Sequence, residues 1–408
     1  MGCSSSAATN DSSACRVSND FHRKYLLGKK LNSLSYGEVY AATPVQKGRY
    51  AFSNDHPTAN GVKIVDLQMG PRVAKLAANE ITRWKMLGQH ENIAQLHEVI
   101  YASVCGHRLC YIVMEACNST LLDYLESVRT LNERVLAECF APMLSALKFM
   151  HANSLAHRDV KPDAFRIGGW DGCTVKLGDF GNSVVLEKEK IKGECGVPLF
   201  MAPEMISGEG YNEKVDVWSL GVLVYILLFG GRLPYNPKDK NSGNDIKIAI
   251  CSNQVAPSFS STVDLSCGAV AFAMSLLERD PAKRPSAKDA LKKSYMVSVK
   301  NGTCELGTEL PCLRFGLIRA KKTKVLEARD ESSDIGINSL LNKMQMEAFG
   351  VPLPLQRSNS FKSTKSGKTT VSTTASRGLM SKSMTDSDVP MTYAPSMFDG
   401  PSSCDIEV

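Results

Sequence analysis

Residues 154–169 read SLAHRDVKPDAFRIGG and place the carboxylate of Asp159 between two basic side chains, Arg158 and Lys161. A carboxylate in such a position can orient a hydroxyl group as a nucleophile, and a nearby ammonium group can neutralise a transferred phosphate. The stretch therefore predicts phosphoryl-transfer chemistry, provided that the rest of the chain supplies groups that hold the phosphates and a metal ion.

Further parts of such a site occur on both sides of this stretch. Phosphoryl transfer needs a cation that positions the phosphates and a carboxylate that holds the metal ion. A lysine on an apolar strand-like run could pair with a glutamate on the helical run that follows it. In chain order, the candidate residues are Lys63 in GVKIV, Glu80 in AANEI, Asp179 in KLGDFG, Glu204 in MAPE, Asp216 in DVWSLG and Arg284 in RDPAKRPS.

Hydrophobic periodicity divides the chain into a strand-rich part and a helical part. From Tyr25 the runs YLLGKKLNSLSYGEVYAATP, GVKIVDL and LCYIVMEAC are typical of strands, and RVAKLAANEITRWKML has helical spacing. Beyond these runs helical patterns dominate up to about Tyr295. A small strand-rich lobe followed by a larger helical lobe predicts an α+β fold in two layers, without internal repeats.

The motifs and their order resemble those of a known family. Residues 21–297 resemble a eukaryotic protein kinase, and Lys161, two residues after Asp159, indicates the serine/threonine branch. The sequences VKIVD, HRDVKP and VPLFMAPE are similar to those of the calcium/calmodulin-dependent group. Within that group they resemble the kinase-like domain of the scaffold CASK. The resemblance implies a bilobal protein kinase fold with ATP and Mg²⁺, or Mn²⁺, as cofactors and proteins as substrates.

The resemblance also implies a role for each candidate residue. Lys63 and Glu80 would position the phosphates, Asp179 would hold the metal ion, Asp159 would orient the hydroxyl group, and Lys161 would neutralise charge. The other residues expected to contact ATP are Asn32, Gly37, Val39, Glu115, Cys117 and Arg166.

Four residues are expected to have structural roles. Glu204 would form an ion pair with Arg284, and Asp216 would hold the backbone of the catalytic loop. Arg158 normally binds an anion on the activation loop, often a phosphate. Because Ser183 is the only hydroxyl between Gly181 and Cys195, we expect Glu194 or Glu189 to supply this charge. The alternative is that LEKEKIKGE is a solvated, salt-bridged stretch.

The phosphate-covering loop departs from the family pattern. The family sequence G-x-G-x-x-G reads NSLSYG here, so that only Gly37 matches. Asn32 can adopt a positive φ at modest cost, whereas Leu34 cannot easily do so. Leu34 also places a side chain where backbone N–H groups should approach phosphate.

Four more departures surround the nucleotide. Ala164 replaces the second metal ligand, and Arg166 replaces an apolar residue beneath the adenine ring. Gly61 replaces an alanine above that ring, and Val197 replaces a threonine that would bond the catalytic Asp and Lys. Loss of a single electrostatic contact often costs about 10² to 10³ in rate. Two functions therefore compete: a weak or atypical kinase, and a pseudokinase scaffold that binds protein partners at a membrane.

The two ends of the chain carry possible attachment signals. MGCSSS fits the myristoylation pattern at Gly2, with Cys3 available for a palmitoyl group, which predicts a cytoplasmic, membrane-associated protein. The alternative is a Ser-rich terminus that matches by chance. The final residues DIEV could be captured by a PDZ domain. Residues 1–20 and the Ser/Thr-rich tail, 351–408, are expected to be disordered.

Residues 298–350 contain two candidate regulatory helices. The segment LRFGLIRAKKTKVL combines five basic residues with Leu313, Leu317 and Leu326, which resembles an autoinhibitory, calmodulin-binding helix, although Gly316 weakens the helical pattern. The alternatives are a basic linker and a patch for acidic lipid. The segment INSLLNKMQMEAFG is expected to dock on the catalytic domain or on a partner helix.

Bulk composition adds two expectations. The net charge of +6 over 408 residues is too small and too scattered to indicate nucleic-acid binding. The 13 cysteines have irregular spacing and no secretory signal precedes them, which favours reduced thiols over disulfides.

Overall fold

The chain divides into two units, Met1–Arg357 and Ser358–Val408, and all the described residues lie in the first. The lipidation candidates Gly2 and Cys3, the tail and the terminal DIEV lie outside the described residues. The computed structural model describes residues 20–34, 36–46, 49–50, 60–104, 107–169, 171–252, 265–301, 309–324, 341–342 and 344–346.

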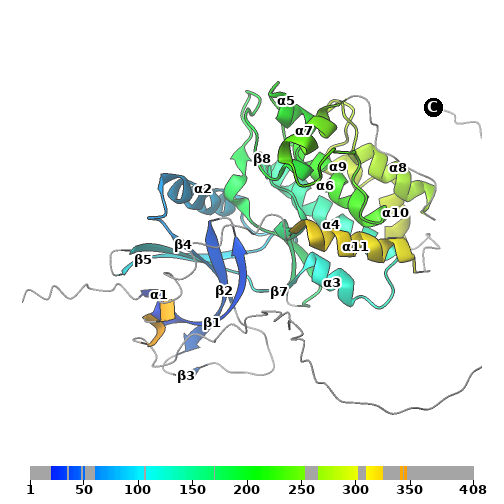
Figure 1. Cartoon of the computed structure of the whole chain (residues 1–408). Helices are drawn as coiled ribbons and strands as arrows, with labels where there is room; N and C mark the ends of the chain where they lie inside the picture. The colour runs from blue at the N-terminus through cyan, green and yellow to red at the C-terminus, as the bar shows by residue number, and fades with distance from the viewer. Residues whose placement is uncertain are drawn as a thin grey trace, which may run out of the picture. The chain divides into compact units, whose positions relative to one another are not determined.

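An antiparallel sheet with the strand order β1-β2-β4-β6-β5 forms the amino-terminal lobe (Figure 1). Successive side chains of a strand point to opposite faces. Val62 and Ile64 accordingly join one apolar cluster, whereas Val65 joins another on the face that carries Lys63. The strands are β1 (Tyr25–Leu34), β2 (Gly37–Gln46), β4 (Asn60–Asp66), β5 (Leu96–Val104) and β6 (His107–Met114), with the short β3 (Arg49–Tyr50) paired to β2.

The helix α2 (Pro71–Leu87) packs against the face of the sheet that carries Lys63. Proline is well suited to the first helical position, and the helix ends before Gly88, whose φ of 66° suits glycine. Its buried residues include Ile81 and Trp84 and recur at helical spacing. Glu80 lies on this buried side, so the helix directs a carboxylate at the sheet.

The second lobe is mainly helical, and its core helix is α6 (Lys214–Leu228). Every residue from Val215 to Leu228 is buried, as expected for a helix that is apolar all round. The other helices of this lobe are α3 (Leu121–Ser127), α4 (Glu133–Ala152), α5 (Pro203–Ser207), α7 (Gly243–Cys251), α8 (Cys267–Leu276), α9 (Ala287–Ala290) and α10 (Ser294–Lys300).

Among the described helices, α4 alone is long and apolar enough to cross a membrane. Length and composition are the only basis for this match, and the buried helices of globular cores pass the same test. The buried residues of α4, among them Phe140, Leu144 and Leu147, belong to the main apolar core of the unit.

Short strands and turns carry the segments expected to be catalytic. β8 (Leu155–Ala156) pairs with β11 (Val184–Val185), so the ends of residues 157–183 are held together. The strand order β10-β9-β7 describes a second small sheet. Its members are β7 (Cys117–Thr120), β9 (Phe165–Gly168) and β10 (Thr174–Leu177), and the 3₁₀ turns are η1 (Pro162–Ala164), η2 (Phe180–Asn182) and η3 (Pro198–Phe200).

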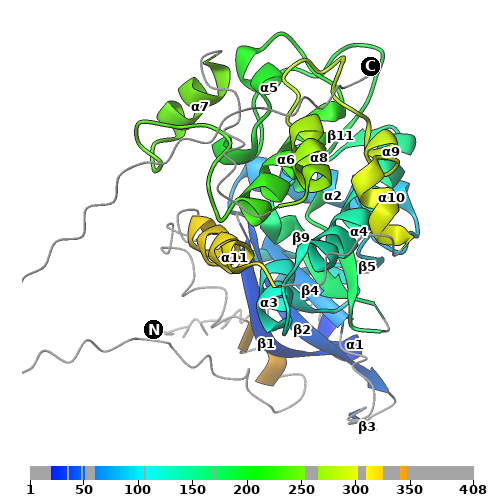
Figure 2. The ribbon, with the colours of Figure 1, turned by 90° about the vertical axis from the view of Figure 1, so that its right-hand side faces the viewer.

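The basic segment after the second lobe forms a helix, α11 (Pro311–Lys324), docked on α3 and α6 (Figure 2). Leu313 and Leu317 are buried, while Leu326 lies outside the described residues. Gly316 does not interrupt the helix: a Cβ on it would lie 2.6 Å from the carbonyl oxygen of Leu227. The glycine therefore permits close contact with α6, which explains its presence in a helical stretch.

Replacing Gly316 with valine is expected to detach α11, because the added side chain would collide with the backbone of α6. Overpacking of this kind costs roughly 1–3 kcal/mol of stability. Thermal unfolding and limited proteolysis between residues 309 and 324 would measure the change. The control is Ile318→Val on the same helix, because Ile318 is 49% exposed. Equal melting temperatures and cleavage rates for the two variants would contradict this account of the contact.

The second carboxy-terminal segment docks on the sheet of the first lobe. Leu341 and Met344 are buried in the apolar cluster on the face away from Lys63. The Gln345 amide makes two hydrogen bonds with the backbone of Leu27, accepting from its N–H at 2.9 Å and donating to its carbonyl at 3.0 Å. With α1 (Asp20–Lys24), which adds Phe21, this segment covers that face of the sheet.

Candidate active site

A buried network of charges joins the first lobe to the segment after β10. Lys63 on β4 is 1% exposed, and its Nζ lies 2.8 Å from Glu80 Oε2 and 3.6 Å from Asp179 Oδ1. Burial alone would raise the pKa of Asp179, but the Lys63 and Lys161 cations outweigh it and hold that pKa below its ordinary value. Asp179 is therefore an ionised carboxylate, the form that a divalent cation binds.

The catalytic loop presents Asp159 beside two donors. Lys161 Nζ lies 3.4 Å from Asp159 Oδ2, and the Asn182 side-chain amide donates to the same oxygen at 3.1 Å. Asn182 directly follows Asp179, Phe180 and Gly181 in η2. Asn182 was not predicted as a site residue, although its position next to the Asp-Phe-Gly triplet was a signal that it lies in the site.

Asp216 anchors the backbone of this loop from the first turn of α6. Its carboxylate accepts from the backbone N–H groups of His157 at 2.8 Å and Arg158 at 2.7 Å. Burial would raise the pKa of Asp216, but the contact with His151 outweighs it and the pKa is lowered. Arg158 has a φ of 64°, a conformation that costs a non-glycine residue energy, so these two bonds hold a strained backbone.

Two other predicted ion pairs have different outcomes. Glu204 and Arg284 form a buried, two-pronged contact, with oxygen–nitrogen distances of 2.6 and 3.1 Å. The expected contact of Glu194 with Arg158 is wrong, because Glu194 pairs instead with Lys247 on α7.

The Arg158 side chain is bound without any carboxylate from the activation loop. It donates to the backbone carbonyl of Asn182 at 2.8 Å and to the Tyr211 hydroxyl at 3.3 Å. Glu189 is exposed, and no contact between it and Arg158 occurs among the described residues. The guanidinium group of Arg158, which was expected to bind an anion, thus donates to a backbone carbonyl and a phenol instead.

A small cavity of about 60 Å³ lies beside Lys63, where the family resemblance places the nucleotide. Glu115 pairs with Lys176 at 2.8 Å across its lining, and burial raises the pKa of the Cys117 thiol to about 11, so the thiol is neutral. The lining residues are Leu34, Val39, Lys63, Glu80, Trp84, Ala94, Met114, Glu115, Cys117, Asp163, Ala164, Arg166, Lys176, Gly178 and Asp179.

Asn32 and Gly37, both expected to contact ATP, are absent from this lining. β1 continues as a strand to Leu34, where it pairs with Gly37, so Asn32 lies opposite Val39 within the sheet. Asn32 is not among the described residues with positive φ. A Cβ on Gly37 would lie 2.9 Å from the carbonyl oxygen of Ile64, so this glycine permits close approach of two strands. The expected loop is a short hairpin instead.

Tyr36, which was not predicted from the sequence, contacts both Lys63 and Glu80. It is 5% exposed, and its hydroxyl donates to Glu80 Oε2 at 2.7 Å. Lys63 Nζ lies 3.7 Å from the centroid of its ring, a cation–π contact. The aromatic residue next to Gly37 in NSLSYG was the available signal, but nothing in the sequence indicates that it points inward.

Of the two metal ligands in the family pattern, the site retains only the Asp179 carboxylate. Asp179 has the charge and the oxygen ligands that Mg²⁺ or Mn²⁺ prefers. Ala164 lines the same cavity and offers no side-chain oxygen. The residues therefore fit one metal ion held by Asp179, and they lack the second ligand of the family pattern.

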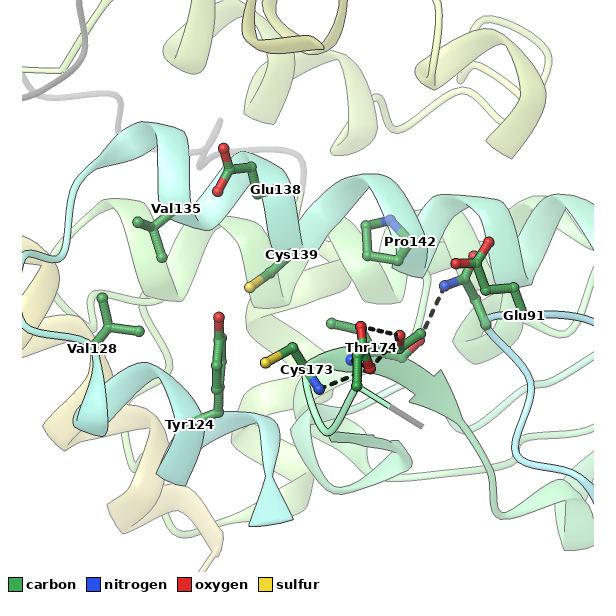
Figure 3. A pocket seen from close by; sticks show the side chains of 12 residues that line it. Glu91, Tyr124, Val128, Val135, Glu138, Cys139, Pro142, Cys173 and Thr174 are labelled. Carbon is green, nitrogen blue, oxygen red and sulfur yellow. Dashed lines mark hydrogen bonds between the residues drawn. The ribbon is translucent and has the colours of Figure 1, made fainter. Parts of the chain in front are cut away.

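A larger cavity of about 310 Å³ lies elsewhere, between α3, α4 and the region of β10 (Figure 3). Tyr124, Cys139 and Cys173 face it, and it shares no lining residue with the cavity beside Lys63. Neither Asp159 nor Asp179 is among the residues that line it.

Comparison with known sequences decides the family. The family model described as protein kinase domain matches residues 30–296, well over half of the chain. The chain belongs to the protein kinase family. Its two-lobed architecture, with a strand-rich first lobe and a helical second lobe, is that of a bilobal protein kinase.

Curated relatives of this kinase are serine/threonine kinases. A calcium/calmodulin-dependent protein kinase type I of Schizosaccharomyces pombe is 30% identical over 74% of this chain and 85% of its own length. An Aurora kinase of the same organism is 29% identical, over 71% of this chain and 76% of its own length. CBL-interacting serine/threonine-protein kinase 7 of Arabidopsis thaliana is 32% identical over 51% of this chain, which spans 46% of that protein.

Replacing Asn182 with leucine is expected to lower the kcat of the kinase by about 10- to 100-fold, because a hydrogen bond to a charged group is worth roughly 1.5–3 kcal/mol. Asn182→Asp should lower it further, since it places a second carboxylate against Asp159. The KM for ATP should change little in Asn182→Leu, because the residue contacts Asp159 and does not line the nucleotide cavity. A kcat for Asn182→Leu equal to that of the wild type would show that this amide is dispensable.

Proposed function

We propose that this kinase transfers the γ-phosphate of ATP slowly to serine or threonine hydroxyls of protein substrates. The main support is that Lys63, Glu80 and Asp179 form one network of charges. Lys161 links the two halves of the site, because it contacts Asp159 and also lowers the pKa of Asp179. These contacts support a single site in which a phosphate-binding half and a hydroxyl-orienting half lie together.

Each residue has a task that follows from its surroundings. Bound ATP and its divalent metal ion would supply the phosphoryl group and neutralise its developing charge. Lys63, fixed by Glu80, holds phosphate oxygens, and ionised Asp179 holds the metal ion. Asp159, an acceptor when ionised, orients the incoming hydroxyl group. Because Ala164 gives no second metal ligand, we expect a rate below that of a complete site by about 10² to 10³.

The test is nucleotide-dependent stabilisation of the full chain. A ligand that binds only the folded state raises the melting temperature in proportion to the logarithm of its concentration over Kd. We expect ATP with Mg²⁺ or Mn²⁺ to raise it, and Lys63→Ala to abolish the shift. An unchanged melting temperature at millimolar ATP, with either metal ion, would contradict the proposal.

A second candidate function is a pseudokinase scaffold, similar in its altered site to the kinase-like domain of CASK. The observations that favour it are the small cavity, the Tyr36 ring inside the site and the missing ligand at Ala164. A scaffold would bind protein partners without phosphoryl transfer. Unchanged partner binding in Asp159→Asn, together with a wild type that transfers no phosphate, would favour this function.

We also propose attachment to membranes on the cytoplasmic side through Gly2 and Cys3. A myristoyl chain alone binds marginally, so a second chain on Cys3 would give stable anchoring. Flotation of the protein with liposomes after expression in eukaryotic cells tests this. Gly2→Ala should release the protein into the soluble fraction, and unchanged flotation would contradict the proposal.

Calmodulin and PDZ domains remain proposed partners of the carboxy-terminal segments. Leu313 and Leu317 of α11 are buried, and Lys321 pairs with Asp123 at 2.8 Å, so calmodulin could bind these leucines only after the helix leaves α3 and α6. Failure of a peptide covering residues 311–328 to bind calcium-loaded calmodulin at micromolar concentration would remove that partner. The terminal DIEV can be tested against PDZ domains as a peptide in the same way.

A further inference from the structure

The Tyr36 side chain lies among the groups that the proposed function assigns to phosphate binding. Its hydroxyl donates to Glu80 Oε2, the same oxygen that Lys63 Nζ approaches at 2.8 Å. Its ring covers the Lys63 ammonium group at 3.7 Å from the centroid. The phenol therefore contacts both the cation that would hold phosphate, through a cation–π contact, and the carboxylate that fixes this cation, through a hydrogen bond.

The phenol also reaches the segment that carries the metal ligand. A Cβ placed on Gly181 would lie 2.1 Å from the Tyr36 hydroxyl oxygen, so the hydroxyl group rests directly against this glycine. Burial, and then the Glu80 and Asp179 carboxylates, raise the pKa of Tyr36, which keeps the phenol protonated as a donor. Tyr36 thus bridges α2, β4 and the segment that begins with Asp179.

The remaining space is too small for a nucleotide. Sites for small molecules commonly have volumes of about 300–1,000 Å³, whereas the cavity here has about 60 Å³. Leu34, at the end of β1, lines the cavity from the same hairpin that carries Tyr36. A phosphate that approaches Lys63 Nζ would compete with the Tyr36 ring, whose centroid lies 3.7 Å from this nitrogen.

We propose that Tyr36 is an internal competitor of the nucleotide phosphates, and that this kinase binds ATP only after the Tyr36 side chain has moved out of the site. This inference rests on the proposed function, because it concerns the access of ATP to the same residues. A site whose competent form is a minor fraction of the population binds its ligand more weakly by that fraction. If Tyr36 competes with the phosphates, its removal should raise the affinity for ATP. If Tyr36 only stabilises the site, its removal should lower that affinity.

The experiment measures binding of a non-hydrolysable ATP analogue with Mn²⁺ to the full chain by calorimetry. Tyr36→Ala is expected to lower Kd about tenfold. Tyr36→Phe should lower it less, because the ring remains over Lys63 while the hydrogen bond to Glu80 is lost. The matched control is Tyr40→Phe, which removes a buried phenol oxygen in the apolar cluster on the opposite face of the sheet and should leave Kd unchanged.

The outcomes separate this inference from the proposed function. A wild type that binds the analogue as tightly as Tyr36→Ala and Tyr36→Phe, or more tightly, would overturn the competitor role and leave the kinase function standing. Absence of binding by the wild type and by both variants at millimolar analogue would overturn both. If Tyr36→Ala does not fold, as judged by its thermal transition, Tyr36→Phe decides alone: a lower Kd supports the inference and an equal or higher Kd contradicts it.

Discussion

Replacing Asp159 with asparagine is expected to lower kcat by about 10² to 10⁴, the range that a positioned acid–base group contributes. The carboxylate is the group that would orient the substrate hydroxyl, and Lys161 and Asn182 hold one of its oxygens. The amide has nearly the same shape, but one of its two oxygens becomes a donor group. Steady-state phosphorylation of a serine-containing peptide, with ATP saturating, measures the change.

A control separates this loss of rate from a loss of nucleotide binding. Asp159 does not line the cavity beside Lys63, so the Kd for ATP should stay within about twofold of the wild type in Asp159→Asn. The melting temperatures of the two proteins should also agree. A variant that keeps its stability and its full kcat would show that phosphate transfer does not use Asp159.

Replacing Ala164 with asparagine is expected to raise kcat by about 10² to 10³, since it restores an oxygen ligand for a second metal ion. Ala164 and Asp179 both line the cavity beside Lys63, so a longer side chain at position 164 would bring its oxygen to the same cavity. The gain should depend on the concentration of free Mg²⁺ or Mn²⁺ above that needed to saturate ATP. Titration of the metal ion at fixed ATP measures it.

Ala164→Leu is the matched control for the volume of the new side chain. Leucine and asparagine are similar in size, but leucine offers no oxygen, so it should not raise kcat at any metal-ion concentration. Equal rates for Ala164→Asn and the wild type over the whole titration would mean that the absent ligand does not limit this kinase.

The fold could be predicted from the sequence because its signals are local and ordered. The segments around Asp159, Asp179 and Asp216 each combine a distinctive residue pattern with a fixed place in the chain, and residues 30–296 match the kinase domain. The helical pattern predicted after the strands includes α6, whose residues from Val215 to Leu228 are all buried. Such patterns can be recognised in the sequence because burial and helix geometry determine where apolar residues occur.

The details of the site depended on contacts between distant segments and could not be predicted in the same way. Tyr36 points inward because Glu80, Lys63 and Gly181 meet around it, and these residues come from three separate elements. The interpretation of Gly316 as a weak point of a helix failed for a similar reason, because its contact is with the backbone of α6. Local propensity is a weak guide where tertiary packing sets the conformation.

The predicted charge partner of Arg158 was incorrect for a related reason. The loop between Gly181 and Cys195 predicted Glu194 or Glu189, yet Glu194 pairs with Lys247 on α7 and Asn182 supplies a backbone carbonyl to Arg158. Which of several charged side chains meet is decided by the path of the chain between them, and a single sequence contains no record of that path.

We expect Asp179, as a single metal ligand, to suffice for phosphate transfer. The most direct measurement is incorporation of phosphate from γ-labelled ATP into a serine- or threonine-containing protein substrate by the full chain, with Mg²⁺ and with Mn²⁺. We expect slow, metal-dependent incorporation by the wild type and none above background by Asp179→Asn. Incorporation that is absent from the folded wild type, or that persists undiminished in Asp179→Asn, would contradict the account.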